Sequence, residues 1–396
     1  MSWNASSVMD ERVRFISDYL GGDQTMTELC LLHGISRPTG YKWVERYHEL
    51  GAAGLCDRSS APYAHGRRTA AVIADGLCAL RRDRPSWGPR KLIAWLNGKQ
   101  PDMAWPSPST AGEILKRAGL VSERKPRRRA PERLGELTTP LHPNHVWAAD
   151  HKGWISAPYG GRLEPLTVTD SFSRYLIALS ATGSTRSGEA SPLFRKAFQA
   201  HGLPETIRTD NGAPFCSTSI TGLTALSAWW ARLGIRHERI DPGQPQQNGR
   251  HERFHLTLKE AMLPPQTSRA DQQQCFDRYR QDYNSERPHE ALGQKPPAQF
   301  WRPSPRPMPD TIPQPSYPAG AQIRKVRSNG EIKWRGDMIH ISGVIVAEPV
   351  ALTEIDNDLW SVHFYDRLIG VIRPNQAKLS RPTNATNKQR AVPQNL

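Results

Sequence analysis

One stretch, residues 205–262, constrains the fold of this chain more than any other. Its first part reads ETIRTDNG and predicts a short strand that ends on the carboxylate of Asp210. Its second part reads GQPQQNGRHE and predicts a polar loop that opens a helix, with Glu252 in the first turn. Carboxylates at a strand end and at a helix start can converge on one point. Two or three such groups together hold divalent metal ions.

A third carboxylate, Asp150, lies upstream in the segment HVWAADHKGW, which also predicts a strand. In chain order the motifs are Trp147-x-x-Asp150, Thr209-Asp210-Asn211-Gly212-x-x-Phe215 and Pro245-x-x-Asn248-Gly249-x-x-Glu252-Arg253-Phe254. This ordered set resembles the catalytic core of DDE transposases and retroviral integrases, specifically insertion-sequence transposases with a retroviral-integrase-like core. The 41 residues between Asp210 and Glu252 are somewhat more than is commonest in that family. We expect the extra length in a surface region, residues 217–228.

The resemblance implies an α/β fold whose RNase H-like core is a mixed five-stranded sheet with helices. In that fold the first and fourth strands lie side by side, which would bring Asp150 and Asp210 together. The resemblance also implies two Mg²⁺ or Mn²⁺ ions, with Asp150 bridging both, Asp210 holding one and Glu252 the other. Hard cations of this kind prefer oxygen ligands, and a metal pair can activate an attacking oxygen and stabilise a leaving one.

The composition points to a polyanionic partner. The formal net charge is +15 over 396 residues, which favours a nucleic-acid-binding protein of two to four domains. The five cysteines form no Cys-x-x-Cys pair, which argues against a disulfide framework and a zinc knuckle. With no apolar run near about 18 residues and no signal peptide expected, we predict a bacterial cytoplasmic, nucleoid-associated protein without a membrane partner.

Residues 1–60 predict a helix-turn-helix DNA-binding domain. Apolar residues at helical spacing predict a helix over 10–20, a capping-box pattern predicts a second over 25–32, and Ser36 opens a third. In this layout the last helix enters the major groove. The residues expected to reach DNA are Arg37, Thr39, Tyr41 and Lys42. The alternative interpretation is an ordinary helical hairpin.

Residues 61–130 predict a second helical or winged-helix DNA-binding unit followed by a basic linker. The candidate DNA contacts of this unit and its linker are Arg90, Lys91, Arg127, Arg128 and Arg129. A basic run of this kind can follow the phosphates of a DNA strand. The alternative is a solvated basic face.

The catalytic core is expected over residues 137–302, and a small SH3-like β-barrel over 320–380. We expect strands over 145–155, 163–169, 175–181 and 205–209, with helices over 187–201 and 270–286. Asp170 follows the second of these strands, where a turn favours aspartate for local hydrogen bonds, so we expect it not to bind metal.

Supporting roles are predicted for residues around the three carboxylates. Lys259 lies two helical turns after Glu252 and therefore on the same helix face, where it can contact DNA. Leu256 is expected to pack. Asn248 is expected to shape the loop and contact DNA, and Asn211 to orient Asp210 or the substrate.

The predicted function is that of a DNA transposase, a divalent-metal-dependent polynucleotidyl transferase. The resemblance implies that water cleaves the element end and frees a 3′-OH, which then attacks target DNA. The predicted partners are double-stranded DNA, both terminal repeats and target, and further copies of the chain in a homodimer or higher multimer. The alternatives are an RNase H-like nuclease or resolvase, and a catalytically silent DNA-binding regulator derived from a transposase.

Overall fold

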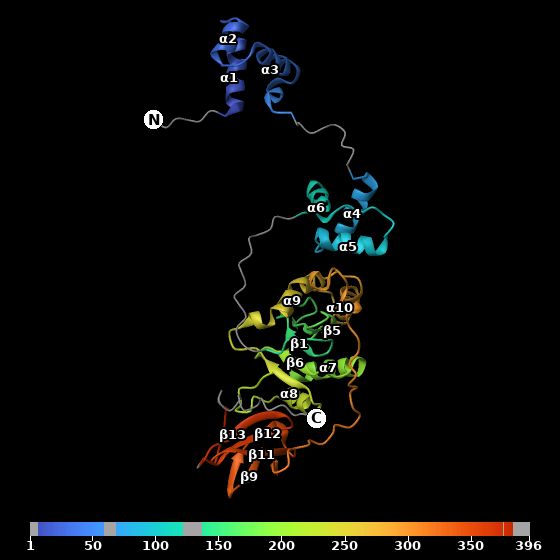
Figure 1. The fold of residues 1–396 in the computed structure, drawn as a ribbon, viewed down its shortest axis with the longest axis vertical. Helices are drawn as coiled ribbons and strands as arrows, with labels where there is room; N and C mark the ends of the chain where they lie inside the picture. Colours follow the sequence, from blue (N-terminus) through green and yellow to red (C-terminus); the bar gives the residue numbers. More distant parts are fainter. Residues whose placement is uncertain (1–6, 59–68, 122–136, 375, 383–396) are drawn as a thin grey trace, which may run out of the picture. The chain divides into compact units, whose positions relative to one another are not determined.

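The computed structural model describes residues 7–58, 69–121, 137–374 and 376–382. The chain divides between Thr69 and Ala70 into two compact units. The first unit contains α1 (Val8–Gly21), α2 (Met26–Leu32), α3 (Arg37–Leu50) and the short 3₁₀ helix η1 (Gly51–Leu55) (Figure 1). These helices agree with the predicted helix-turn-helix layout.

Caps and close packing set the shape of this first unit. Thr25 and Glu28 form the predicted capping box at the start of α2, and the Ser36 side chain caps α3. The buried core includes Phe15, Leu29 and Trp43. Gly40 allows α3 to approach α2, because a Cβ at this position would lie 2.6 Å from the Cys30 sulfur.

The second unit begins with three helices, α4 (Ala71–Asp83), α5 (Pro89–Lys99) and α6 (Pro108–Arg117). They enclose a core that contains Leu77, Trp87, Leu92 and Leu115. Residues 69–121, the described part of this region, contain no strand, so the helical form of the prediction applies to them and the winged form does not. The predicted basic linker lies outside the described residues.

The core sheet has five strands, β1 (Val146–His151), β4 (Leu166–Asp170), β5 (Leu176–Ser180), β6 (Thr206–Thr209) and β7 (Arg236–Arg239). Their order is β5-β4-β1-β6-β7. β1, β4 and β5 pair antiparallel, whereas β1–β6 and β6–β7 are parallel. The sheet is therefore mixed, and the first and fourth core strands are neighbours, as the RNase H-like prediction required.

The first strand is shorter than predicted. β1 ends at His151, and a separate hairpin follows, made of β2 (Ile155–Ser156) and β3 (Arg162–Leu163). The interruption coincides with Gly153, whose φ of +82° is incompatible with a continuous strand.

Helices cover both faces of the core sheet (Figure 1). α7 (Ser187–His201) and α8 (Ala225–Arg232) share a buried cluster with Trp147 and Ala149 of β1. On the opposite face lie α9 (Gly249–Met262) and α10 (Arg269–Ser285), whose apolar residues form another cluster. Because side chains alternate along a strand, Asp150 is on the α9 side of the sheet. The connecting 3₁₀ helices are η2 (Pro245–Asn248), η3 (Glu290–Leu292) and η4 (Pro297–Gln299).

The C-terminal region is a small antiparallel β domain, as predicted. Its elements are β8 (Gln322–Lys325), β9 (Glu331–Trp334), β10 (Asp337–His340), η5 (Gly343–Ile345), β11 (Pro349–Asp356), β12 (Leu359–Phe364), β13 (Arg367–Ile372) and β14 (Leu379–Ser380). A five-stranded sheet has the order β14-β13-β12-β11-β8, and β9 and β10 form a hairpin. Among the described helices, none is both long and apolar enough to cross a membrane.

The expectation that residues 217–228 form a surface region is wrong for their second half. α8 begins at Ala225, and Leu223 and Ala228 are buried in the same cluster as the apolar core of the C-terminal β domain. An ion pair of 3.0 Å between Arg232 and Glu348 joins the same two regions. The start of α8 packs against the apolar residues of the β domain and buries them. Local sequence patterns do not reveal a contact between segments so far apart in the chain.

Candidate active site

Two carboxylates of the predicted triad reach the same end of the sheet through parallel strands. Asp150 is near the end of β1, and Asp210 directly follows β6. Ala148 pairs with Arg208 in the β1–β6 ladder, and continuing this register by two residues brings Asp150 opposite Asp210. The parallel pairing therefore explains why residues 60 positions apart meet.

Glu252 joins them from the first turn of α9. The pKa of Asp150 is raised to about 7, first by burial, then by the negative charges of Asp210 and Glu252. The backbone of His151 and the ammonium of Lys152 oppose this shift. The charges of Asp210 and Glu252 thus act on Asp150, Glu252 the more weakly of the two, and the assignment of all three carboxylates to one metal site stays a prediction.

The loop after β6 is shaped around Asp210. The Gly212 N–H donates a hydrogen bond of 3.1 Å to Asp210 Oδ1. A Cβ at Gly212 would lie 3.0 Å from Asp210 Oδ2, so glycine leaves room for the carboxylate. The Asn211 side chain donates to the Ile240 carbonyl at 2.7 Å. Asn211 therefore fastens the loop to the segment after β7, and its predicted role in orienting Asp210 is indirect.

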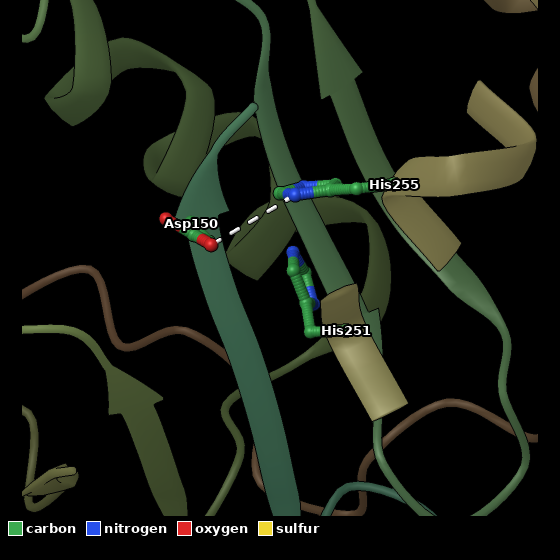
Figure 2. Close-up of side chains that lie close together, drawn as sticks. All are labelled: Asp150, His251 and His255. Carbon is green, nitrogen blue, oxygen red and sulfur yellow. Dashed lines mark ion pairs between the residues drawn. The ribbon is translucent and has the colours of Figure 1, made fainter. Parts of the chain in front are cut away.

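Two histidines from α9 face Asp150 across the surface of the sheet (Figure 2). His255 Nδ1 is 3.8 Å from Asp150 Oδ2. Its other ring nitrogen is 2.8 Å from the hydroxyl of Thr167, and His251 Nε2 is 2.6 Å from the same hydroxyl. The second nitrogen of His251 is 2.9 Å from the Thr169 hydroxyl. The two threonines lie on β4, so this network ties the Glu252 helix to the sheet.

Proton counting fixes the direction of each hydrogen bond. The Thr167 hydroxyl has one proton, which it donates to the Asp150 carbonyl at 2.9 Å. Both imidazoles must then donate Nε2–H to the two lone pairs of that oxygen. His251 Nδ1 accepts the Thr169 proton, and His255 Nδ1 directs its lone pair at Asp150. Burial lowers the pKa of His251 to about 3 and, with nearby positive charge, that of His255 to about 2, so both rings are neutral.

Because both histidines are neutral, they contribute no positive charge to the Asp150 carboxylate. The Asp150–His255 separation falls within ion-pair distance, but a ring with a pKa of about 2 makes a polar contact there instead. Asp150, His251 and His255 offer ligand atoms within 4.8 Å of one another. Both nitrogens of His251, however, are already used by threonines. The better donor set for a hard divalent cation is the three carboxylates, whose repulsion a cation would relieve.

Most of the predicted DNA-contacting residues in the described ranges are accessible. Arg37, Tyr41 and Lys42 are exposed on α3, Thr39 is half-buried, and Lys259 is exposed on α9. Arg90 is exposed and lies 3.1 Å from Glu290, and Lys91 is half-buried. Asn248 is only 6 % exposed, which fits the predicted loop-shaping role, and its DNA contact stays a prediction. Arg127, Arg128 and Arg129 lie outside the described residues.

Two further predictions concern neighbours of the triad. Leu256 was expected to pack, and this is wrong, because it is 59 % exposed between Glu252 and Lys259 on the outer face of α9. Asp170 has the expected local role. Its buried carboxylate accepts hydrogen bonds from the Asn144 N–H at 2.8 Å and from the Ser173 N–H at 2.7 Å.

The histidine–threonine network was missed in the sequence. Its signal is present, since two histidines four residues apart flank Glu252, and two threonines alternate in LTVTD. Helical periodicity places the two histidines on one face of α9, and strand periodicity places the two threonines on one face of β4. The sequence does not show that these two faces pack against each other.

Family models match most of the regions described above. An integrase core domain model matches residues 140–245, and a second integrase core domain model matches residues 233–297. A helix-turn-helix domain model matches residues 11–63, and a homeodomain-like domain model matches residues 39–115.

Two curated relatives come from bacterial insertion elements. The insertion element IS476 uncharacterized 39.2 kDa protein of Xanthomonas euvesicatoria is 32% identical over 44% of this chain, and the match spans 50% of that protein. The insertion element IS407 uncharacterized 31.7 kDa protein of Burkholderia multivorans is 28% identical over 58% of this chain and 80% of its own length. The chain thus spans half of the first relative and four fifths of the second.

Among solved structures, a simian T-cell lymphotropic virus intasome in complex with the PP2A regulatory subunit B56 gamma covers 76% of this chain and 100% of the matched chain, at 19% identity and a TM-score of 0.37. The integrase core matches, the helix-turn-helix matches and the insertion-element relatives show that this chain is similar to insertion-element proteins and contains an integrase core preceded by helix-turn-helix domains.

Proposed function

We propose that this chain is a divalent-metal-dependent DNA transposase that cleaves the ends of its insertion sequence and joins the freed 3′-OH to target DNA. The observation that supports it most is the convergence of Asp150, Asp210 and Glu252 from two strands and a helix. Burial first, and then the charges of Asp210 and Glu252, raise the pKa of Asp150 to about 7. Such clustering of like charges costs stability and is typical of functional sites.

Asp150, Asp210 and Glu252 would hold Mg²⁺ or Mn²⁺, and we propose two ions. When bound, the metal supplies Lewis-acid activation of the attacking oxygen and charge stabilisation of the leaving oxygen. The donor set fits this role because all three groups are carboxylates, which are the preferred ligands of hard cations. The repulsion at Asp150 is the part of the structure that a cation would offset.

The surrounding residues prepare this site. His251 and His255 are neutral and hydrogen-bonded to Thr167, so they position Asp150 without taking its proton at neutral pH. Gly212 orients Asp210 by its N–H. Lys259, exposed two turns along α9 from Glu252, is placed to contact a DNA phosphate beside the carboxylates.

We further propose that the DNA is double-stranded and includes both element ends and the target. The helix-turn-helix matches and the net charge of +15 support binding to it. One triad serves one strand end, so two or more chains would act together on a transposon with two ends. A bacterial protein that acts on chromosomal DNA would work in the cytoplasm at the nucleoid.

The test is incubation of the purified chain with duplexes carrying its own element ends, a target plasmid and Mg²⁺ or Mn²⁺. Sequencing of the junctions should find element 3′ ends joined to plasmid. Cleavage without joining would favour an RNase H-like nuclease or resolvase. Binding with neither cleavage nor joining would favour a catalytically silent regulator.

A further inference from the structure

A short hairpin extends the central strand pair beyond Asp150. The Lys152 N–H donates to the Pro165 carbonyl at 2.9 Å, and Ile155 of β2 pairs with Leu163 of β3. Asp150 itself pairs with Thr167 in the adjoining β1–β4 ladder. The hairpin over residues 152–165 therefore starts at the carboxylate that is central to the proposed site.

The hairpin is also attached to the helix that carries Glu252. Leu163 and Ala157 are buried in one cluster with Phe254 and Leu258 of α9. Hydrogen bonds link the hairpin to the Asp150 strand, and apolar packing links it to α9. The hairpin is thus held in a fixed position relative to both carboxylates.

Trp154 is the unusual residue of this hairpin, because its side chain is 54 % exposed. Trp147 and Trp230 of the same core are fully buried. The Arg162 guanidinium lies over the Trp154 ring, 4.5 Å from its centroid. An exposed indole supported by a guanidinium gives little to the core, but it forms a flat surface on which a planar group can stack.

Distance and charge identify that planar group. Trp154 is four residues after Asp150, and four residues span at most about 14 Å. Successive bases of a DNA strand are about 3.4 Å apart along the axis, so Trp154 lies within about four nucleotides of a phosphodiester at Asp150. The hairpin carries two basic residues, Lys152 and Arg162, and one acidic residue, Glu164, so its net charge is positive, which suits a nucleic-acid strand.

We propose that Trp154 is a stacking platform for an unpaired base close to the phosphodiester that the carboxylates hold. The proposal rests on the proposed function, since the ligand is the DNA on which that site acts. Bases stack on aromatic side chains irrespective of sequence. Arg162 would hold the indole in position and neutralise the adjoining phosphate. Opening the last base pairs of an element end would then be favoured by capture of the released base.

The direct test places 2-aminopurine, a fluorescent adenine analogue, at each of the last four positions of an element-end duplex. The full-length chain is added without divalent metal, so that binding is measured without cleavage. We expect the indole to quench the probe at one of these positions. Trp154→Ala should lose this quenching, whereas Trp154→Phe should retain a stacked base, seen as a fluorescence lower than that with Trp154→Ala.

A matched control is available on the same hairpin. Tyr159 is an exposed aromatic residue, 37 % exposed, but it lies nine residues after Asp150, in the turn between β2 and β3. Tyr159→Ala should leave the probe signal unchanged. Equal loss of signal in both alanine variants would overturn the assignment to Trp154, as would a signal that Trp154→Ala does not change.

A second arm separates base capture from a structural role. In the presence of Mg²⁺, Trp154→Ala should cleave fully paired ends about five- to a hundredfold more slowly, the factor that corresponds to loss of one stacking contact. Ends with a mismatch at the captured position need no opening, so the variant should cleave them nearly as well as the wild type. Equal loss on both substrates would refute the proposal.

Two further outcomes test the assignment of Trp154. If wild-type protein cleaves no end at all, the proposed function fails, but the fluorescence arm still tests Trp154. A change of multimer size by light scattering in Trp154→Ala, with unchanged fluorescence, would assign the exposed indole to a contact between copies and overturn the proposal.

Discussion

Replacing Asp150 with asparagine should stabilise the metal-free protein at alkaline pH while removing its activity. In the native structure the ionised Asp150 is disfavoured by burial and by the charges of Asp210 and Glu252. Asparagine has nearly the same size and no charge. Its amide can also donate to the free lone pair of His255 Nδ1, which faces this position. The substitution therefore removes an unfavourable charge without creating a cavity.

The size of the effect follows from the pKa shift. The pKa of Asp150 rises from 3.8 to about 7 on folding. A difference of about three pKa units corresponds to roughly 4 kcal/mol, because each unit is about 1.4 kcal/mol. The side chain keeps 19% exposure, and the two neighbouring carboxylates can reorient, so we expect about 2–4 kcal/mol. For a unit of this size, Ala70–Leu396, the melting temperature should rise by roughly 3–6 °C.

The sign of the pH dependence is specific. Because the folded pKa is raised, the stability contributed by the protonated group is fully present below about pH 4, the unfolded pKa, and is lost as the pH rises through about 7. The advantage of Asp150→Asn should accordingly be greatest at pH 8.5 and smaller at pH 5.5. Calorimetric or fluorescence melts of the full chain in EDTA at both values measure it.

Two controls make the result decisive. Mg²⁺ should raise the melting temperature of the wild type at pH 8.5 but have much less effect on Asp150→Asn, since a ligand is missing. Glu238→Gln should destabilise, by about 1–3 kcal/mol, because this carboxylate accepts hydrogen bonds from the Thr138 N–H at 2.8 Å and from Arg208 Nε at 2.7 Å, and its pKa is lowered, not raised. The reasoning is refuted if Asp150→Asn is no more stable than wild type at pH 8.5, or gains equally at pH 5.5.

Three further predictions concern the triad, its hydrogen-bond network and assembly. Asp210→Asn and Glu252→Gln should each reduce cleavage and joining by roughly a thousandfold or more, with DNA binding nearly unchanged in a gel-shift assay. Near-normal joining by either would contradict their roles. Thr167→Val keeps the side-chain shape but leaves two imidazole N–H groups and the Asp150 carbonyl without their hydrogen-bond partner. We therefore expect the free energy of unfolding, measured with denaturant, to fall by roughly 2–5 kcal/mol. A loss below 1 kcal/mol would show that the network contributes little. Mixing Asp150→Asn protein with a variant lacking residues 1–130 should restore joining if end-binding and catalysis come from different chains. Additive inactivity of the mixture, with a monomer on DNA by light scattering, would exclude such sharing.

The sequence alone predicted the kind of core and indicated three carboxylates, in a fixed order, as its candidate site. Each motif combines a chemical group with a local pattern, a strand end or a helix start, and such patterns depend on residues adjacent in the chain. The helix-turn-helix unit was predictable for the same reason. The capping side chains of Thr25 and Ser36 each accept a hydrogen bond from the backbone N–H only three residues further along the chain. The pairing of β1 with β6 came from the resemblance and is confirmed by the register.

Only the tertiary structure decided which residues support the carboxylates. His251 and His255 meet Thr167 across more than 80 positions of sequence, and only the packing of α9 on β4 brings them together. The raised pKa of Asp150 likewise depends on burial and on charges from two other elements. Gly153 ends the first strand and starts the hairpin of Trp154, and Leu223 is buried by a distant β domain. Burial and hydrogen bonding between distant segments depend on how the whole chain packs, whereas periodicity and capping are local properties of the sequence.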